Sequence, residues 1–287
     1  MGLNDLFTKK SIVTKTKTMI ETTTTTEEKV VKDDTEEKAL EKIAPEKIGV
    51  LDMVIAFDTT GSMAAYIEAV RQEVAELIPN LFKDNEDLRL GIVAFGDYCD
   101  MNNAQDFGDA YQCLMPTNNE NDIIKFVRES KDTSGGDGDE FYELVIKKIV
   151  EETPWREDST RAILLISDAD PHPLGYTYKD YVVGNQIDWR KEAQKAAEMK
   201  IKIDTVTIRE AEWYKELSQM TNGISVPFAS GHKTARLVEA ATNARGSIKA
   251  RMKFDEMYKS CVDDECLSVF ASYQAERESV EEEKDKK

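Results

Sequence analysis

Oxygen-bearing side chains gather in three short segments of the sequence: DTTGSM at 58–63, TSGGD at 133–137 and SDAD at 167–170. In the first segment Asp58, Thr60 and Ser62 alternate, so one carboxylate and two hydroxyls can face a single point. Gly61 lets the backbone turn tightly between them. Hard oxygen ligands around a small, hard cation are what Mg²⁺ prefers in proteins. The first segment therefore predicts a divalent-cation site.

Each segment also has a simpler explanation. Asp58 or Thr60 alone is typical of a helix cap, but a cap does not need three alternating acceptors. A flexible loop explains the second segment as well as a ligand role does for any one of its residues. Asp168 alone could end a strand in solvent, whereas together with Asp58 it indicates a ligand. Asp170 is better explained as a loop residue, and His172 either lines the rim of the site or is structural.

Strands and helices alternate between these segments. The apolar run GVLDMVIAF suits a strand covered on both faces, and residues 63–82 carry apolar side chains at helical spacing. Further strands are expected in RLGIVAFGDY, AYQCLM, RAILLISDAD, KIDTVTI and SVPF, and further helices at about 119–129, 140–152, 189–199, 211–220 and from 233. This order predicts an α/β fold of three layers, with a doubly wound, six-stranded, mostly parallel sheet. AYQCLM is the expected antiparallel edge strand.

The predicted sheet gives the three polar segments a common place. In an open parallel sheet, ligands bind in the crevice at the carboxyl ends of the strands. Asp58 and Asp168 each follow a buried strand, and the 133–137 loop precedes a helix. We therefore expect all three segments to leave the same edge of the sheet.

Composition divides the chain into three parts and limits its partners. Residues 1–47 predict a flexible arm rich in Thr, Lys and Glu, 48–246 a folded domain, and 247–287 a charged extension, helical or disordered. The net charge of −18, from 56 acidic and 38 basic residues, disfavours nucleic acid and anionic membrane as partners. No segment is typical of a signal peptide or membrane span, and the four cysteines lack a zinc-binding spacing. We expect a soluble, cytoplasmic protein with reduced thiols.

The motif DTTGSM after a hydrophobic strand resembles the D-x-S/T-x-S motif of the metal-ion-dependent adhesion site in von Willebrand factor A domains. The similarity runs over about 48–245 and includes GIVAFGDY, GGD before a helix, and LLISDADPH. These variants most resemble intracellular A domains, including those of proteins with atypical alpha-kinases. About forty residues follow the domain, which is too few for a kinase.

The resemblance implies a set of metal ligands. The residues that match the family's ligands are Asp58, Thr60, Ser62 and Asp168. Alignment on the glycines puts Asp137 where the family has a separate threonine ligand, and Thr133 is the other candidate. The implied ion is Mg²⁺ or Mn²⁺, and a protein partner would dock on it. A third carboxylate would leave the filled site negatively charged, which weakens capture of an acidic side chain.

The leading hypothesis is therefore a divalent-cation-dependent protein-binding module and not an enzyme. One alternative is a Mg²⁺-dependent phosphohydrolase with an aspartate nucleophile. Such an enzyme needs a second acid two residues after the nucleophile, where this chain has Thr60. Another alternative is a metal-independent scaffold whose terminal arms recruit partners.

Overall fold

The computed structural model describes residues 49–179, 186–227 and 234–285. The predicted N-terminal arm, residues 1–47, lies outside this part. The described residues from 49 onward belong to one compact unit. None of the helices in the described part is both long and apolar enough to cross a membrane.

A six-stranded sheet forms the centre of the molecule, in the order β3-β2-β1-β5-β7-β8. Its strands are β1 (Val50–Asp58), β2 (Asp87–Phe95), β3 (Tyr111–Thr117), β5 (Thr160–Ser167), β7 (Ile201–Thr207) and β8 (Ser225–Pro227). Every neighbouring pair is parallel except β2 and β3, which run antiparallel. The predicted fold class is confirmed, including AYQCLM as the antiparallel edge strand.

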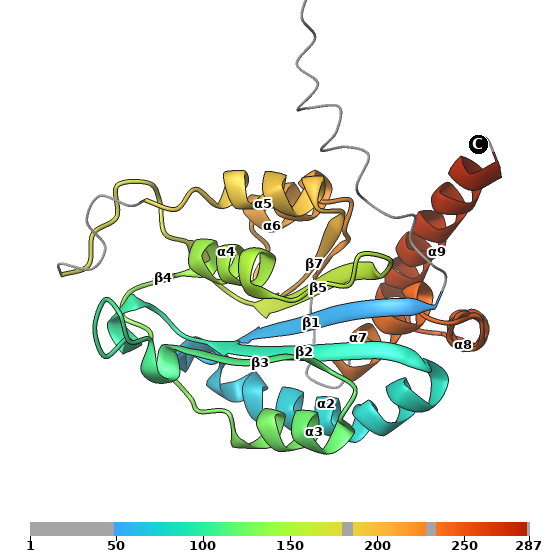
Figure 1. Ribbon diagram of the computed structural model, residues 1–287, viewed down its shortest axis with the longest axis horizontal. Helices are drawn as coiled ribbons and strands as arrows, with labels where there is room; N and C mark the ends of the chain where they lie inside the picture. The colour runs from blue at the N-terminus through green and yellow to red at the C-terminus, as the bar shows by residue number, and fades with distance from the viewer. Residues whose placement is uncertain (1–48, 180–185, 228–233, 286–287) are drawn as a thin grey trace, which may run out of the picture. The chain divides into compact units, whose positions relative to one another are not determined.

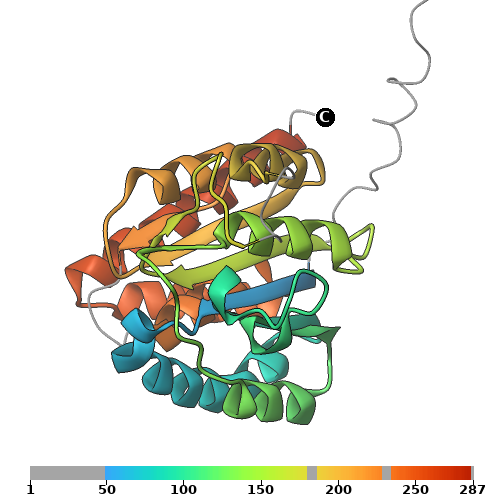
Figure 2. The ribbon, with the colours of Figure 1, turned by 90° about the vertical axis from the view of Figure 1, so that its left-hand side faces the viewer.

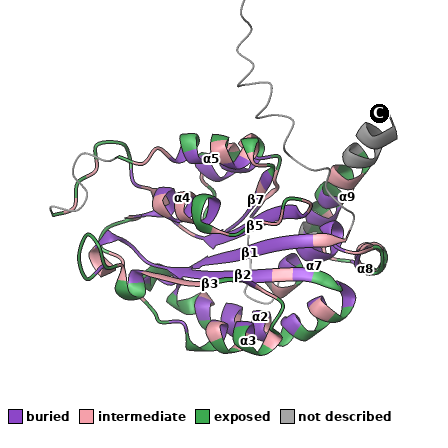
Figure 3. Cartoon of the chain, viewed as in Figure 1, coloured by how far each residue is buried: buried purple, intermediate pink, exposed green. Residues whose placement is uncertain are grey.

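Helices cover both faces of the sheet, so the central strands are buried on both sides (Figures 1 and 3). One face carries α2 (Ala64–Asp84), α3 (Glu120–Glu129) and α7 (Thr234–Arg245), and the other α4 (Tyr142–Glu152), α5 (Trp189–Glu198) and α6 (Glu212–Met220). All eight residues of β5 are buried. This explains why its sequence is a continuous apolar run and not an alternating one.

Short elements at the carboxyl edge of the sheet were not predicted. They are the 3-10 turns η1 (Gly61–Met63), η2 (Tyr98–Asp100) and η3 (Gly108–Ala110), and the two-residue strands β4 (Asp139–Glu140) and β6 (Asp170–Pro171). β4 and β6 pair in parallel with each other, apart from the main sheet. This pair fastens the 133–140 loop to the loop after β5. Figure 2 shows the molecule from this side.

The C-terminal extension forms two helices, α8 (Ile248–Ser260) and α9 (Asp264–Asp285). Phe254 on α8 and Phe270 and Tyr273 on α9 are almost completely buried in the same core as α2 and α7. The helices after residue 246 are therefore part of the folded core on this face of the sheet.

A buried ion network fastens α9 to the sheet. The Arg245 guanidinium at the end of α7 binds both carboxylate oxygens of Asp204 on β7 and both of Glu276 on α9. The Tyr273 hydroxyl donates a hydrogen bond of 2.9 Å to Asp204 Oδ2. The Arg245 side chain is only 3% exposed and that of Asp204 is 0% exposed. Removing one member would leave the others charged and out of water.

We expect Arg245→Met to lower the free energy of unfolding by about 3–5 kcal/mol, the usual cost of breaking a buried ion pair from one side. Arg190→Met is the matched control, because Arg190 also binds both oxygens of a carboxylate, that of Glu216, but on the surface. The control should cost less than about 1 kcal/mol. Urea denaturation of both variants measures the difference, and equal losses would contradict a stabilising role for the buried network.

Candidate metal site

Asp58 lies at the carboxyl end of β1 and is 0% exposed. Its Oδ1 accepts hydrogen bonds from the Thr60 amide (2.8 Å) and the Thr60 hydroxyl (2.7 Å). Its Oδ2 accepts one of 2.6 Å from the hydroxyl of Tyr142, the first residue of α4. Burial raises the pKa of Asp58 to about 6, although these hydrogen bonds oppose the shift. The carboxylate is therefore held in a fixed position and away from water.

A chain of hydroxyl contacts leads from Asp58 to the loop after β5. The Thr60 hydroxyl lies 3.2 Å from that of Ser62, and the Ser62 hydroxyl donates a hydrogen bond of 3.1 Å to Asp168 Oδ1. Thr60 is buried, whereas Ser62 is exposed and Asp168 half-buried. Four of the predicted ligands thus lie together. Asp58 and Thr60 form the buried side of the cluster, and Ser62 and Asp168 form the side that is open to solvent.

The 133–136 loop is fastened across the first motif. The Thr133 amide donates to the Thr59 carbonyl (3.0 Å), and the Gly61 amide donates to the Ser134 carbonyl (3.3 Å). Gly135 has φ +69°, and a Cβ there would lie 2.8 Å from Glu140 Oε1 and 3.3 Å from Thr60 Cβ. Only glycine combines this backbone conformation with so close an approach. The glycines of the second segment therefore let this loop close over the first.

Aromatic residues of α6 fix the loop that carries Asp168. Trp213 Nε1 and the Tyr214 hydroxyl both donate to the carbonyl of the next residue, Ala169, at 3.1 and 2.6 Å. The Ala169 amide in turn donates a hydrogen bond of 3.3 Å to the Tyr142 hydroxyl, which also binds Asp58. The backbone around Asp168 is thus tied both to α6 and to the Asp58 carboxylate.

Two buried acids beside the site were not predicted. Glu140 on β4 is 3% exposed and lies against Thr60, and its Oε2 has no hydrogen-bond partner among the described residues. Burial, together with the charges of Asp58 and Asp97, raises the pKa of Glu140 to about 9. Asp97, just after β2, is 0% exposed. Asp97 follows the strand in GIVAFGDY, so the strand-end rule could have indicated it.

The structure gives Asp137 neighbours outside the Asp58 cluster. One ligand atom each from Asp137, Asp97 and His172 lies within 4.8 Å of the others. Within the described residues, no hydrogen bond joins Asp137 to the four clustered ligands. The Thr133 hydroxyl, the other candidate, lies 3.0 Å from that of Thr59. That either residue supplies the middle-loop ligand stays a prediction.

The clustered residues suit a divalent cation. Two carboxylates and two hydroxyls offer the hard oxygens that Mg²⁺ and Mn²⁺ bind. Burial and the nearby charge of Asp168 raise the pKa of Asp58, so negative charge is poorly compensated here. Beside it, Glu140 Oε2 is buried without a hydrogen-bond partner among the described residues. A cation would relieve this, so the residues present fit the ion that the motif implies.

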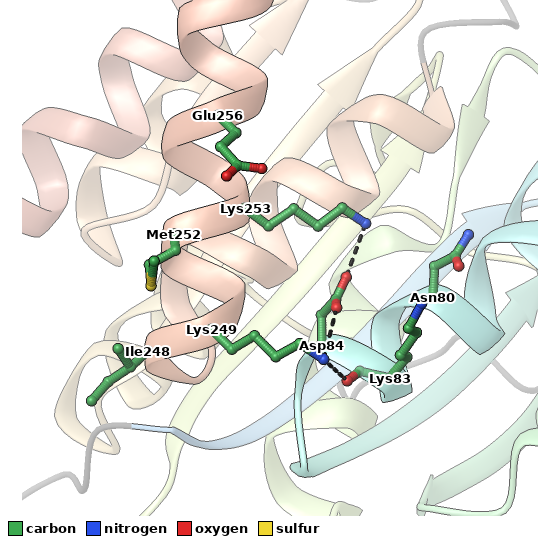
Figure 4. Close-up of a pocket in the computed structure, with 8 residues that line it drawn as sticks. All are labelled: Asn80, Lys83, Asp84, Ile248, Lys249, Met252, Lys253 and Glu256. Atoms are coloured by element: carbon green, nitrogen blue, oxygen red, sulfur yellow. Dashed lines mark hydrogen bonds and ion pairs between the residues drawn. The ribbon is translucent and has the colours of Figure 1, made fainter.

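A pocket elsewhere on the molecule is separate from this site. Asn80, Lys83, Asp84, Ile248, Lys249, Met252, Lys253 and Glu256 line it (Figure 4). It lies between α8 and the C-terminal end of α2. Since α2 begins at the metal motif and has 21 residues, its far end is about 30 Å away. Lys249 and Lys253 bridge to that end, donating to the Lys83 carbonyl (2.6 Å) and to Asp84 (2.9 Å).

Comparison with known proteins identifies the family. The model of the von Willebrand factor type A domain matches residues 52–243, well over half of the chain. The alpha-protein kinase vwkA of Dictyostelium discoideum is 28% identical over 128 residues, which are 44% of this chain and 19% of that kinase. The chain thus covers about a fifth of that relative's length.

The chain belongs to the von Willebrand factor type A domain family. Domains of this family commonly serve as protein-interaction modules. The sequence resemblance, including that to the A domains of alpha-kinase proteins, is confirmed.

We expect the metal-free protein to lose stability as the pH rises from about 6 to 8. Glu140 titrates near its ordinary value of 4.5 when unfolded and at about 9 when folded, so between these values the folded state holds the extra proton. The free energy of unfolding then falls with pH, by on the order of 1 kcal/mol per pH unit. Asp58 contributes with the same sign up to about pH 6, and Glu143, whose pKa burial raises to about 7, up to about pH 7.

Urea denaturation in EDTA at several pH values measures this slope. Glu140→Gln should flatten the slope between pH 7 and 8 and raise the stability at pH 8, whereas Glu157→Gln, on an exposed residue, should leave the slope unchanged. A wild-type slope that survives in Glu140→Gln would show that Glu140 is not the responsible group.

Proposed function

We propose that this chain is a divalent-cation-dependent protein-binding module. The observation that carries the proposal is the chain of contacts from Asp58 through Thr60 and Ser62 to Asp168, residues on two loops 106 positions apart. These polar groups lie at the carboxyl edge of the sheet, where open parallel sheets bind their ligands.

Each of the four residues has a role in this proposal. Asp58 and Asp168 supply carboxylates, and Thr60 and Ser62 supply hydroxyl oxygens, to one Mg²⁺ or Mn²⁺. The bound ion offers an electropositive point to an oxygen of the partner. The exposed Ser62 and half-buried Asp168 mark the open side, where a partner protein would dock.

The charge of the filled site bears on the partner. With Asp58 and Asp168 as the only charged ligands, the two carboxylates balance a divalent ion. If Asp137 also bound this ion, the site would be negative and would attract acidic side chains less. We favour the four-residue set, because the near neighbours of Asp137 are Asp97 and His172.

Two features bear on the alternative functions. Thr60 stands two residues after Asp58, where a phosphohydrolase needs its second acid, so no carboxyl group is placed there to protonate the leaving oxygen. The kinase activity named for the Dictyostelium relative belongs to a protein about five times as long as the matched segment. We therefore propose binding and not catalysis. A cytoplasmic location is part of the proposal; the thiols of Cys99, Cys113 and Cys261 are free, as a reducing compartment favours.

We expect calorimetry to show Mg²⁺ and Mn²⁺ binding to the wild type, and saturating metal to raise the melting temperature. At a hundredfold excess over Kd, linkage gives about 2.7 kcal/mol, or roughly 5–10 °C for a domain of this size. Asp58→Asn should abolish the gain, because the amide keeps an acceptor for Thr60 but removes the charge. The fold should persist, since the core does not include the ion.

Asp170→Asn is the matched control, because it removes one charge from the same loop as Asp168 at a residue paired with Arg209 on the surface. It should bind metal like the wild type. No binding to the wild type at millimolar Mg²⁺ or Mn²⁺ would make the central claim wrong.

We also expect partner capture to depend on the metal site. A pull-down with the wild type in Mg²⁺ should retain a protein that is lost in EDTA and with Asp58→Asn, and that Asp170→Asn still retains. Deletion of residues 1–47 should leave this capture intact. Capture that survives EDTA and Asp58→Asn but not the deletion would instead support the scaffold in which the arm recruits partners.

A further inference from the structure

A second cluster of metal-binding side chains lies on neighbouring loops of the same edge. Asp97 follows β2, Asp137 precedes β4, and His172 follows β6. Pairing of β4 with β6, with Glu140 opposite Pro171, brings the second and third of these loops together. One ligand atom from each of the three side chains lies within 4.8 Å of the others.

Asp97 has an unused oxygen in this cluster. Its Oδ1 lies 2.7 Å from His172 Nε2, but Oδ2 has no hydrogen-bond partner among the described residues, and the side chain is 0% exposed. A Cβ at Gly136 would lie 3.7 Å from this oxygen, so Oδ2 faces the loop that carries Asp137. Burying a carboxylate oxygen without a partner is energetically costly. A cation bound here would satisfy it.

The imidazole is held in place and also has a free nitrogen. His172 is 4% exposed, and its Nδ1 has no hydrogen-bond partner among the described residues. The Tyr176 ring stacks on it at 3.7 Å between centroids, and the Tyr98 ring lies 5.4 Å away. The Tyr176 hydroxyl donates to Asp137 Oδ2 at 3.4 Å. Such packing orients a ligand before the metal arrives, which strengthens binding.

We propose that Asp97, Asp137 and His172 form a second cation site, for Zn²⁺ or a similar transition metal, separate from the Mg²⁺ site at Asp58. An imidazole nitrogen with carboxylate oxygens suits Zn²⁺ and Co²⁺, whereas Mg²⁺ prefers oxygen ligands alone. Two carboxylates balance the charge of the ion. Asp137 is exposed, so the ion can enter from solvent and keep an open position there.

The experiment uses the full chain and Zn²⁺ as the probe, in saturating Mg²⁺ so that the Asp58 site is occupied. The sequence has only two histidines, His172 and His232, so ring NMR signals separate them. We expect Zn²⁺ to shift the His172 ring signals and leave those of His232 unchanged. Calorimetry should show one Zn²⁺ bound.

Variants assign the ligands and separate the two sites. His172→Gln should abolish this Zn²⁺ binding, and Asp137→Asn, at an exposed position where folding is not at risk, should weaken it by about tenfold or more. Asp58→Asn should lose Mg²⁺ but bind Zn²⁺ like the wild type. Unchanged His172 signals, undiminished Zn²⁺ binding by Asp137→Asn, or loss of Zn²⁺ binding in Asp58→Asn would each overturn the second site.

Discussion

The structure depends on burying carboxylates at one edge of a parallel sheet. Asp58, Asp97 and Glu140 are at most 3% exposed, and their contacts are with hydroxyls, a backbone amide and one imidazole. Burying charge without a cationic partner is costly. Glu140, with a pKa raised to about 9, avoids this cost by keeping its proton, whereas divalent cations would offset it at Asp58 and Asp97. Both proposed sites therefore follow from the same constraint.

Rigid ties between loops make this arrangement possible. Asp100 accepts hydrogen bonds from the Ser134 and Gly135 amides. The Thr59 hydroxyl and amide both donate to the Phe95 carbonyl at the end of β2, and the Thr59 carbonyl accepts a hydrogen bond from the Thr133 amide. The β4–β6 pair then holds the middle loop against the last one. Glu140 lies beside Thr60 of the Asp58 cluster. Asp137, three positions earlier in the chain, lies beside Asp97 and His172. The loops therefore act as one framework for two candidate ions.

Much of the fold could be predicted because buried strands and amphipathic helices leave regular patterns, and the strand-end rule placed Asp58 and Asp168 on one edge. Glu140 could not be found this way, because its position depends on a two-residue strand whose partner lies 31 positions further along the chain. The sequence does not decide whether the segment of α8 and α9 is helical or disordered, since its apolar residues are scattered among charged ones. Their place in the core comes from tertiary contacts of Phe254, Phe270 and Tyr273.

The most direct test of the central claim is a crystal structure grown with saturating Mn²⁺, with anomalous scattering to locate the ion. The account predicts an anomalous peak bounded by Asp58, Thr60, Ser62 and Asp168. It also predicts that Asp58→Asn crystals grown in the same way lack this peak. Wild-type crystals in saturating Mn²⁺ with no anomalous density among these four residues would contradict the account.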